Sequence, residues 1–217
     1  MTRILEKENT IASNFLAELR DEVIQKDSMR FRRNLERIGE VMAYEVSKTL
    51  DYSFRKVVTP LGESDMMLCE DNIVIATILR AAVPMANGML NIFDKAEFAF
   101  VAAHRHYRKK GEMEICVEQV TTPSLEDKVL IIVDPMVATA ASMELAYEAL
   151  LEKGGIPRHT HICSVLCSEE GRLRVENSLC RGRVSFWSVA CDKEMTNKSY
   201  IVPGLGDAGD LAYGSKL

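Results

Sequence analysis

The stretch that decides the fold is Val129–Ser142, VLIIVDPMVATAAS. It opens with five apolar, mostly β-branched residues, a pattern typical of a strand buried on both faces of a parallel sheet. Asp134 and a run of small residues follow, and Ser142 begins a helical pattern. The N–H groups of a first helical turn lack partners and the helix dipole is positive there, so a strand, tight loop and helix in this order can hold a phosphate. The alternative is that this segment has a purely structural role, as in many α/β proteins.

The composition places the chain among ordinary folded proteins. It has 217 residues, of which 47% are hydrophobic and 27% charged, enough for a single α/β domain over residues 1–217. The net charge of −5 argues against nucleic acid as a partner. No apolar run approaches the roughly 20 residues of a membrane span, and the polar N-terminus does not resemble a signal peptide. With six scattered cysteines and no C-x-x-C pair, we expect reduced thiols in a cytoplasmic protein.

The apolar periods on either side of the central stretch alternate between helix and strand. Alternating strands and helices predict parallel βαβ units, and Thr59–Gly62 between two extended segments predicts a hairpin turn. Two helices are expected before the first strand. The predicted helices are 11–26, 28–50, 84–93, 142–153 and 169–179, and the predicted strands are 52–58, 66–69, 73–78, 98–103, 114–120, 129–133, 161–166 and 184–190.

Cationic residues occur at three places in this pattern. Arg80 follows the strand 73–78, at the end of a parallel sheet where ligands bind, which favours an anionic ligand over a structural ion pair. The segment 104–111, after the next strand, is basic. It indicates either a solvated hairpin tip or a flap that closes on an anion. Arginines on the helix 28–50 indicate either a solvated, salt-bridged face or a phosphate or interface role.

Two further features concern metals and bases. The pairs His104/His106 and His159/His161 have the i, i+2 spacing of one strand face, but without a third ligand in register metal binding is not favoured. The tail Tyr200–Asp210, YIVPGLGDAGD, has neither a helical nor a strand period. Its glycines allow a close approach of the backbone to a ligand, and its apolar residues favour a docked loop that reads the edge of a flat base over a disordered tail.

The chain resembles the uracil phosphoribosyltransferase family along nearly its full length. The resemblance rests on VDPMVAT…S at 133–142 and on the tail at 200–210, with Ile78–Ala81 and the flap arginine in support. It implies a phosphoribosyltransferase-type central parallel sheet flanked by helices. An N-terminal helical segment (1–50), a β-hairpin flap (104–120) and a uracil-binding loop with the C-terminus (199–217) would complete the domain.

The resemblance also implies an activity. Such enzymes join uracil to 5-phosphoribosyl 1-diphosphate (PRPP) with Mg²⁺, giving UMP and diphosphate in pyrimidine salvage. A homodimer or homotetramer is implied, and some relatives respond to GTP. No covalent nucleophile is required, because positioning and charge stabilisation can carry such a transfer.

Individual roles follow from the same resemblance. Asp207, Asp134 and Arg105 would be the catalytic residues, with Arg105 preferred over Arg108 as the flap arginine. Uracil would be read by Ile201, Gly206, Asp207 and Ala208. No protein metal ligand is assigned, since Mg²⁺ would be held mainly by PRPP. The PRPP-binding residues would be Arg80, Arg105, Asp134, Pro135, Met136, Val137, Ala138, Thr139, Ala140, Ala141, Ser142 and Asp207.

The chain departs from the family pattern where glycine is usual. Ala140 and Ala141 stand in the phosphate-binding segment, and Ala82 follows Arg80–Ala81. If one of these positions requires a positive φ, we expect the segment to flatten and to bind PRPP weakly, so that glycine at 140 and 141 would lower the KM for PRPP about tenfold. These alanines also leave open an alternative function, a non-catalytic sensor of uracil, UMP or PRPP.

Overall fold

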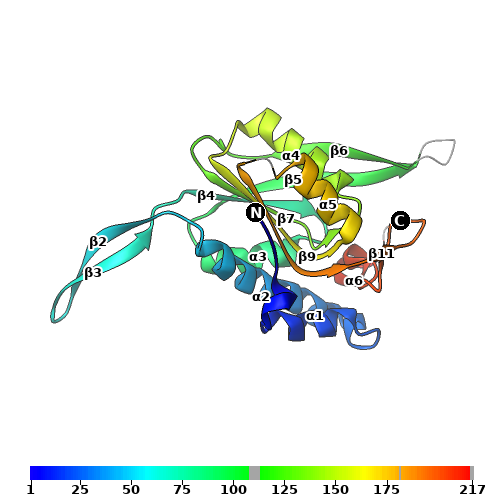
Figure 1. Cartoon of the computed structure of the whole chain (residues 1–217), viewed down its shortest axis with the longest axis horizontal. Coiled ribbons are helices and arrows are strands. Elements are labelled where there is room, and N and C mark those ends of the chain that lie inside the picture. The colour runs from blue at the N-terminus through cyan, green and yellow to red at the C-terminus, as the bar shows by residue number, and fades with distance from the viewer. Residues whose placement is uncertain (108–112, 181, 216–217) are drawn as a thin grey trace.

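The protein is organised around one eight-stranded sheet in the order β1-β10-β9-β7-β4-β5-β6, with β8 pairing to β9 (Figure 1). The structure, a computed structural model, describes residues 1–107, 113–180 and 182–215, and leaves out the side chains of 104–107 and 113–116. All pairings in this sheet are parallel except that of β5 with β6. The strands are β1 (Thr2–Ile4), β4 (Ile73–Leu79), β5 (Glu97–Tyr107), β6 (Met113–Thr121), β7 (Val129–Val133), β8 (Met136–Val137), β9 (His159–Ser168) and β10 (Val184–Asp192).

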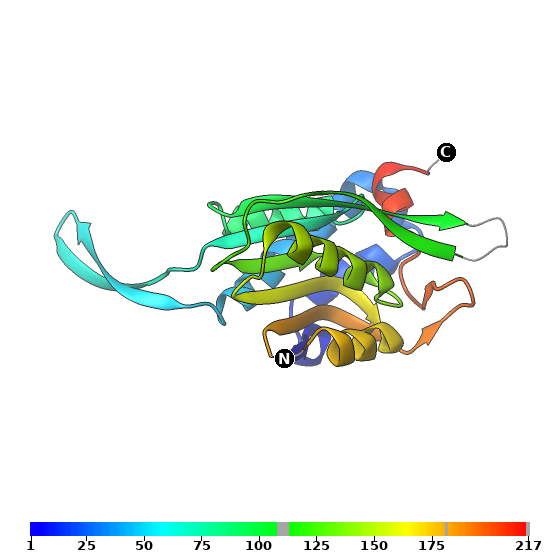
Figure 2. The same ribbon diagram turned by 90° about the horizontal axis from the view of Figure 1, so that it is seen from above.

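Helices cover both faces of the sheet because the central strands are apolar on both sides. Ile131 faces one core with helices α1, α2 and α3, whereas its neighbour Leu130 faces the other with α4 and α5. Figures 1 and 2 show the two helical layers on opposite sides of the strands. The predicted α/β class is confirmed. The helices are α1 (Ala12–Arg20), α2 (Ser28–Ser47), α3 (Val83–Ile92), α4 (Ala141–Gly154), α5 (Glu169–Ser178) and α6 (Ala208–Tyr213), with short 3₁₀ turns η1 (Leu5–Glu8) and η2 (Ile24–Lys26).

The N-terminal region differs from the prediction in two respects. The strand β1 precedes the helices and pairs in parallel with Phe186–Ser188 of β10. Three residues are too few to show a period, and their partner lies at the other end of the chain. The expected helix 11–26 is also interrupted, because Asp21 Oδ1 accepts from the N–H groups of Val23 and Ile24 at 2.8 and 2.9 Å and starts a new turn there.

The C-terminal tail contains regular structure that the sequence pattern did not predict. The strand β12 (Ile201–Val202) pairs with β11 (Glu194–Met195), and α6 follows. α6 has only six residues and includes a glycine, so its pattern carries little information. Its first turn is stabilised by the side chain of Asp207, which accepts from the N–H groups of Gly209 and Asp210 at 2.9 and 3.0 Å.

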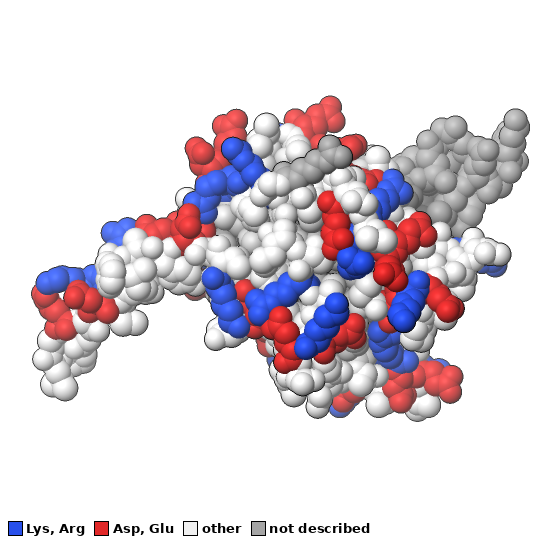
Figure 3. All heavy atoms as spheres, in the orientation of Figure 1, with Lys and Arg blue, Asp and Glu red and all other residues white. Residues whose placement is uncertain are grey.

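The predicted hairpin is confirmed and forms an arm that projects from the sheet (Figures 1 and 2). It consists of β2 (Tyr52–Thr59) and β3 (Gly62–Cys69), paired antiparallel. Its apolar side chains are largely outside the core: Leu61 is 99% exposed and Val58 82%. The outermost end of the arm carries no charge in Figure 3.

The rest of the drawn surface mixes charges of both signs (Figure 3). The arginines of α2 are engaged: Arg30 pairs with Glu18, Arg33 pairs with Glu36, and Arg32 donates to the Ala212 carbonyl at 2.7 Å. These contacts favour a solvated, salt-bridged helix face over a phosphate or interface role. Within the described ranges, no helix is long and apolar enough to cross a membrane.

Candidate functional site

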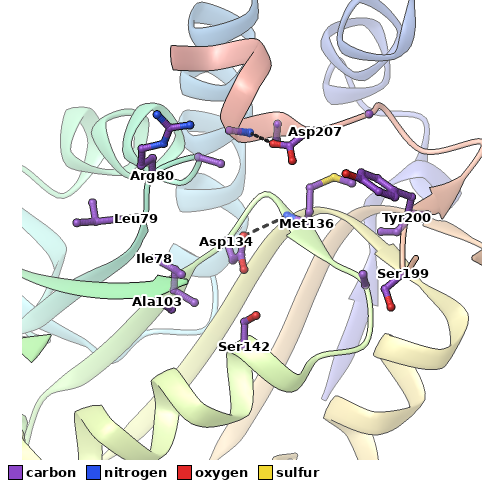
Figure 4. Close-up of a pocket in the computed structure, with 16 residues that line it drawn as sticks. Ile78, Leu79, Arg80, Ala103, Asp134, Met136, Ser142, Ser199, Tyr200 and Asp207 are labelled. Carbon is purple, nitrogen blue, oxygen red and sulfur yellow. Dashed lines mark hydrogen bonds between the residues drawn. The ribbon is translucent and has the colours of Figure 1, made fainter. Parts of the chain in front are cut away.

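A pocket of about 490 Å³ lies at the carboxyl ends of β4 and β7, where open α/β sheets bind ligands (Figure 4). It lies between the segment Asp134–Ser142, called here the phosphate loop, and the segment Tyr200–Asp210, called the base loop. The central stretch and the tail of the sequence thus meet in one cavity. Its lining residues are Ile78, Leu79, Arg80, Ala81, Ala103, Asp134, Met136, Ala138, Ser142, Ser199, Tyr200, Ile201, Gly206, Asp207, Ala208 and Gly209.

The phosphate loop begins directly at the end of β7 and leads into α4. One carboxylate oxygen of Asp134 accepts from the Met136 N–H at 3.3 Å, which turns the chain inside the loop. A smaller hollow continues the pocket along the loop and is lined by every residue from Met136 to Met143 together with Asp134 and Ser199. Pro135 lines neither space, and its carbonyl accepts from the Leu166 N–H at 3.0 Å, so its contact is structural.

The alanines of the loop differ sharply in backbone conformation. Ala140 has φ 62° and ψ 0°, in the left-handed region where a Cβ is unfavourable. Ala141 is the first residue of α4, and Ala82 has φ −77° and ψ −16°, so neither is strained. The loop therefore does require a left-handed residue, as one sequence hypothesis held. The expectation that an alanine there would flatten the loop is wrong, because Ala140 adopts the conformation itself.

The loop keeps this shape because α5 packs against its outer side. The buried hydroxyl of Ser168 donates to the Ala138 carbonyl at 2.6 Å and accepts from the Gly171 N–H at 2.8 Å. A Cβ on Gly171 would lie 2.2 Å from the same carbonyl oxygen, so only glycine allows this approach. The Ala138 carbonyl is thereby turned toward α5.

The base loop uses glycine for its left-handed positions. Gly204 has φ 62° and Gly206 has φ 87°. A Cβ on Gly204 would lie 2.1 Å from the Ile201 carbonyl oxygen. Asp207 closes the loop as the N-cap of α6, with both N–H donors on its Oδ1, and Figure 4 shows its carboxylate at the pocket.

Arg80 links the sheet to α6 across the pocket. Its Nη2 donates to the Gly214 carbonyl at 3.0 Å and lies 3.4 Å from Asp210 Oδ1. Its Nε is buried without a hydrogen-bond partner in the part of the chain that the structure describes. A guanidinium with a donor still to be satisfied beside a cavity suits an anionic ligand.

The flap arginine and the histidine pair of β9 stand apart from the residues that line the pocket. The backbone of Arg105 lies in β5 opposite Ile115, but its side chain and all of Arg108 fall outside the described residues, so the choice between them stays a prediction. His159 bonds Ser185 Oγ at 2.9 Å, and His161 accepts from Trp187 Nε1 at 3.1 Å. Burial lowers the pKa of His161 to about 3, which makes it a neutral core residue.

Sequence reasoning assigned no role to several residues that line the pocket. Tyr200 and Gly209 lie inside the quoted base loop, so membership of that segment was the available signal. Ser199 has φ 59°, and Ala103 comes from the neighbouring strand β5. Ser199 lies in the segment 199–217 that the resemblance assigned to uracil binding, whereas nothing in the local sequence marks Ala103 as lining a site.

Comparisons with known proteins agree with this arrangement. The family model described as uracil phosphoribosyltransferase matches residues 6–215. A protein of Porphyromonas gingivalis named uracil phosphoribosyltransferase is 50% identical over 210 residues, 97% of this chain and 96% of that protein. One of Pyrococcus furiosus with the same name is 38% identical over 204 residues, 93% of this chain and 85% of that protein.

A solved structure has the same overall fold. The AQ2163 protein from Aquifex aeolicus superposes with a TM-score of 0.87 at 25% identity, covering 100% of both chains. The strand–loop–helix of the phosphate loop, the glycine-built base loop and the whole-length matches together show that the chain belongs to the uracil phosphoribosyltransferase family.

Proposed function

We propose that this protein transfers the 5-phosphoribosyl group of PRPP to uracil, giving UMP and diphosphate, as a pyrimidine-salvage enzyme. The observation that carries the proposal is the convergence of the phosphate loop and the base loop on one 490 Å³ pocket. One loop suits a phosphorylated sugar and the other suits a flat base. Transfer between two ligands requires both to lie in one cavity.

The reaction forms a bond between the ribose anomeric carbon and a uracil ring nitrogen, and it breaks the bond from that carbon to the diphosphate oxygen. Positive charge develops on the sugar as negative charge leaves with the diphosphate. We assign Asp134 to the ribose hydroxyls and the N–H groups of Val137–Ser142 to the 5′-phosphate. Arg80 would bind the diphosphate, because it lines the pocket and its Nε has no hydrogen-bond partner among the described residues.

The base would be held by backbone groups of Ile201, Gly206 and Ala208, all of which line the pocket. Asp207 lies between this part of the pocket and Arg80. Because Asp207 Oδ1 holds the first turn of α6, Oδ2 is the oxygen that can face the reacting groups. A fixed carboxylate at this place can stabilise the developing positive charge on the sugar.

Mg²⁺ fits this site as a companion of the substrate. Among the residues that the structure describes, no three His, Cys, Asp or Glu side chains form a metal cage. The pocket does offer the carboxylates of Asp134 and Asp207, and Mg²⁺ in such sites is commonly held by one or two carboxylates and the substrate phosphates. When bound, it would neutralise charge on the departing diphosphate. Omitting Mg²⁺ and adding a chelator should abolish transfer, with recovery on readdition.

The deciding experiment is UMP formation from uracil and PRPP in the presence of Mg²⁺, followed by chromatography. We expect turnover with uracil and little with cytosine, adenine or hypoxanthine. Absence of UMP with the folded protein would overturn the proposal. The sensor alternative rested on a flattened phosphate loop, and the left-handed Ala140 removes that ground.

For assembly we propose that the β2–β3 arm packs against a second copy of the chain. A two-stranded hairpin is marginally stable alone, and its exposed apolar residues need a cover. Sedimentation should show a dimer or tetramer that Val58→Asp with Leu61→Asp dissociates. A monomeric parent protein would contradict this. Activation by GTP stays a prediction, testable in the same UMP assay.

A further inference from the structure

An ion pair lies behind the base loop, on the side away from the pocket. Arg20, the last residue of α1, and Asp192, the last residue of β10, form two parallel bonds: Nη1 to Oδ2 and Nη2 to Oδ1, each 2.8 Å. Their side chains are only 22% and 10% exposed. Such a bidentate, half-buried pair has a fixed geometry, unlike a single contact between flexible surface chains.

Both partners also bind the backbone of one base-loop residue. Arg20 Nη1 donates to the Gly204 carbonyl at 3.0 Å, and the Gly204 N–H donates to Asp192 Oδ2 at 2.9 Å. Burial opposes ionisation of Asp192, but the bonds from Arg20 and Gly204 outweigh it and lower the pKa of Asp192, so the charged pair persists at neutral pH. Gly204 is therefore held through both of its backbone polar groups.

A neighbouring residue extends the same support. The Gln25 amide, oriented with its nitrogen toward nearby carbonyls, donates to Leu205 at 2.8 Å and to Leu19 at 3.2 Å. The carbonyls of two successive base-loop residues thus bond to side chains from the α1–η2 segment. These contacts hold the outer turn of the loop while its inner residues line the pocket.

The held position lies between the residues that meet the ligand. Ile201 and Gly206 line the pocket, and Gly204 is the left-handed turn between them. A loop that reads a base through backbone N–H and C=O groups discriminates only as well as those groups are fixed. Neither Arg20 nor Asp192 lines the pocket, so any effect they have on the base must act through the loop.

We infer that Arg20 and Asp192 are positioning residues that set the affinity and selectivity for uracil by fixing Gly204 from behind. The inference rests on the proposed function. It predicts that weakening the Arg20–Asp192 pair raises the KM for uracil and leaves the KM for PRPP unchanged, because the phosphate loop is supported separately by Ser168.

The test is steady-state kinetics of Arg20→Lys and Asp192→Asn with each substrate varied in turn. Lysine keeps the charge but not the fork that reaches Asp192 and Gly204 together, and asparagine keeps the shape but not the charge. We expect the KM for uracil to rise about tenfold, with the KM for PRPP within about twofold and a smaller preference for uracil over cytosine. The double variant should be no worse than the worse single variant, because both act through one pair.

A matched control is Arg30→Lys. Arg30 of α2 makes a comparable two-bond contact with Glu18 of α1, at 2.9 and 2.8 Å, but donates to no base-loop residue. Both KM values should stay at the parent level. An unchanged uracil KM in folded Arg20→Lys, or an equal rise for both substrates, would overturn the inference. If Asp192→Asn fails to fold, Arg20→Lys decides alone.

Calorimetry with uracil separates this inference from the proposed function. A parent protein that binds uracil but forms no UMP would refute the function, and weaker uracil binding by Arg20→Lys would still support the positioning role. Parent and variant that bind uracil equally would refute the positioning role alone. A parent that binds no uracil would refute both.

Discussion

The phosphate loop and the base loop both place a residue at φ 62°, but one uses alanine and the other glycine. Ala140 is the residue directly before the helix α4, and Ser168 and Gly171 hold the loop from outside. Gly204 lies in a loop whose nearest strand has two residues, and a charged pair holds it. The loop around Ala140 accommodates a Cβ in the left-handed conformation, whereas a Cβ on Gly204 would lie 2.1 Å from the Ile201 carbonyl oxygen, so only the base loop depends on glycine.

Asp207→Asn should have the largest effect on activity. It separates the catalytic role of this carboxylate from its role as the N-cap of α6. Asparagine caps a helix as well as aspartate, so α6 should persist, while loss of the carboxylate charge should lower kcat about 100-fold. The measurements are kcat and the thermal midpoint. Asp27→Asn, at the N-cap of α2, is the matched control and should leave kcat unchanged. A large drop in the thermal midpoint would instead assign Asp207 a structural role.

Gly204→Ala tests whether the base loop depends on glycine. The added Cβ would meet the Ile201 carbonyl at 2.1 Å at a left-handed position, and a cost of about 2 kcal/mol would raise the uracil KM about 30-fold. Gly182→Ala has a similar φ of 82° with nothing within 4 Å, so it carries the backbone cost alone and should leave both KM values unchanged. If Gly204→Ala kept the parent KM for uracil, the base loop would not depend on glycine at this position.

Ser168→Ala tests the support of the phosphate loop. The Ala138 carbonyl and the buried Gly171 N–H would each lose a partner, at a cost of about 1–3 kcal/mol. Because part of this cost falls on the phosphate loop, we expect the PRPP KM to rise about fivefold. The uracil KM should not change. Ser188→Ala removes a similar buried bond, 2.8 Å to Ala190, from the adjacent strand and should leave the PRPP KM unchanged. A rise in the uracil KM would show that the two loops are not supported independently.

Ala140→Gly should have the smallest effect and act on stability. Because Ala140 is already left-handed before any ligand binds, its cost belongs to folding, so glycine should raise the free energy of unfolding by about 1 kcal/mol. Ala141→Gly, at the first position of α4, should lower it by about 0.5 kcal/mol at most, because glycine costs less there than in a helix interior. Denaturant titration measures both. A tenfold fall in the PRPP KM of Ala140→Gly would restore the earlier expectation of a flattened loop.

The sequence predicted the parts of the fold that depend on local periodicity. Each of these elements carries a recognisable local pattern. Examples are the apolar strand Val129–Val133, the long helix Ser28–Ser47 with its helical spacing of apolar residues, and the turn of the hairpin. The strand Thr2–Ile4 and the helix Ala208–Tyr213 were missed because they are short and are stabilised by a distant strand and by a cap.

The candidate site was predictable to the extent that single segments carry it. The phosphate loop and the base loop each show their turn chemistry in the sequence, and the structure brings them together. Ser168 and the pair Arg20–Asp192 have no local signal, because their partners lie 30 and 172 residues away. Contacts of that range depend on the topology of the sheet.

The long separation between Arg20 and Gly204 also has a consequence for how the chain is made. The base loop begins at Tyr200 of 217 residues, so the sheet strands through β10 and the whole phosphate loop are synthesised before it. Chains acquire structure from the N-terminus during translation, and Gly204, which accepts from Arg20, is synthesised 184 residues after it. A chain that stops after β11 thus contains the residues of the phosphate loop and both members of the Arg20–Asp192 pair, but it lacks the loop that would choose a base.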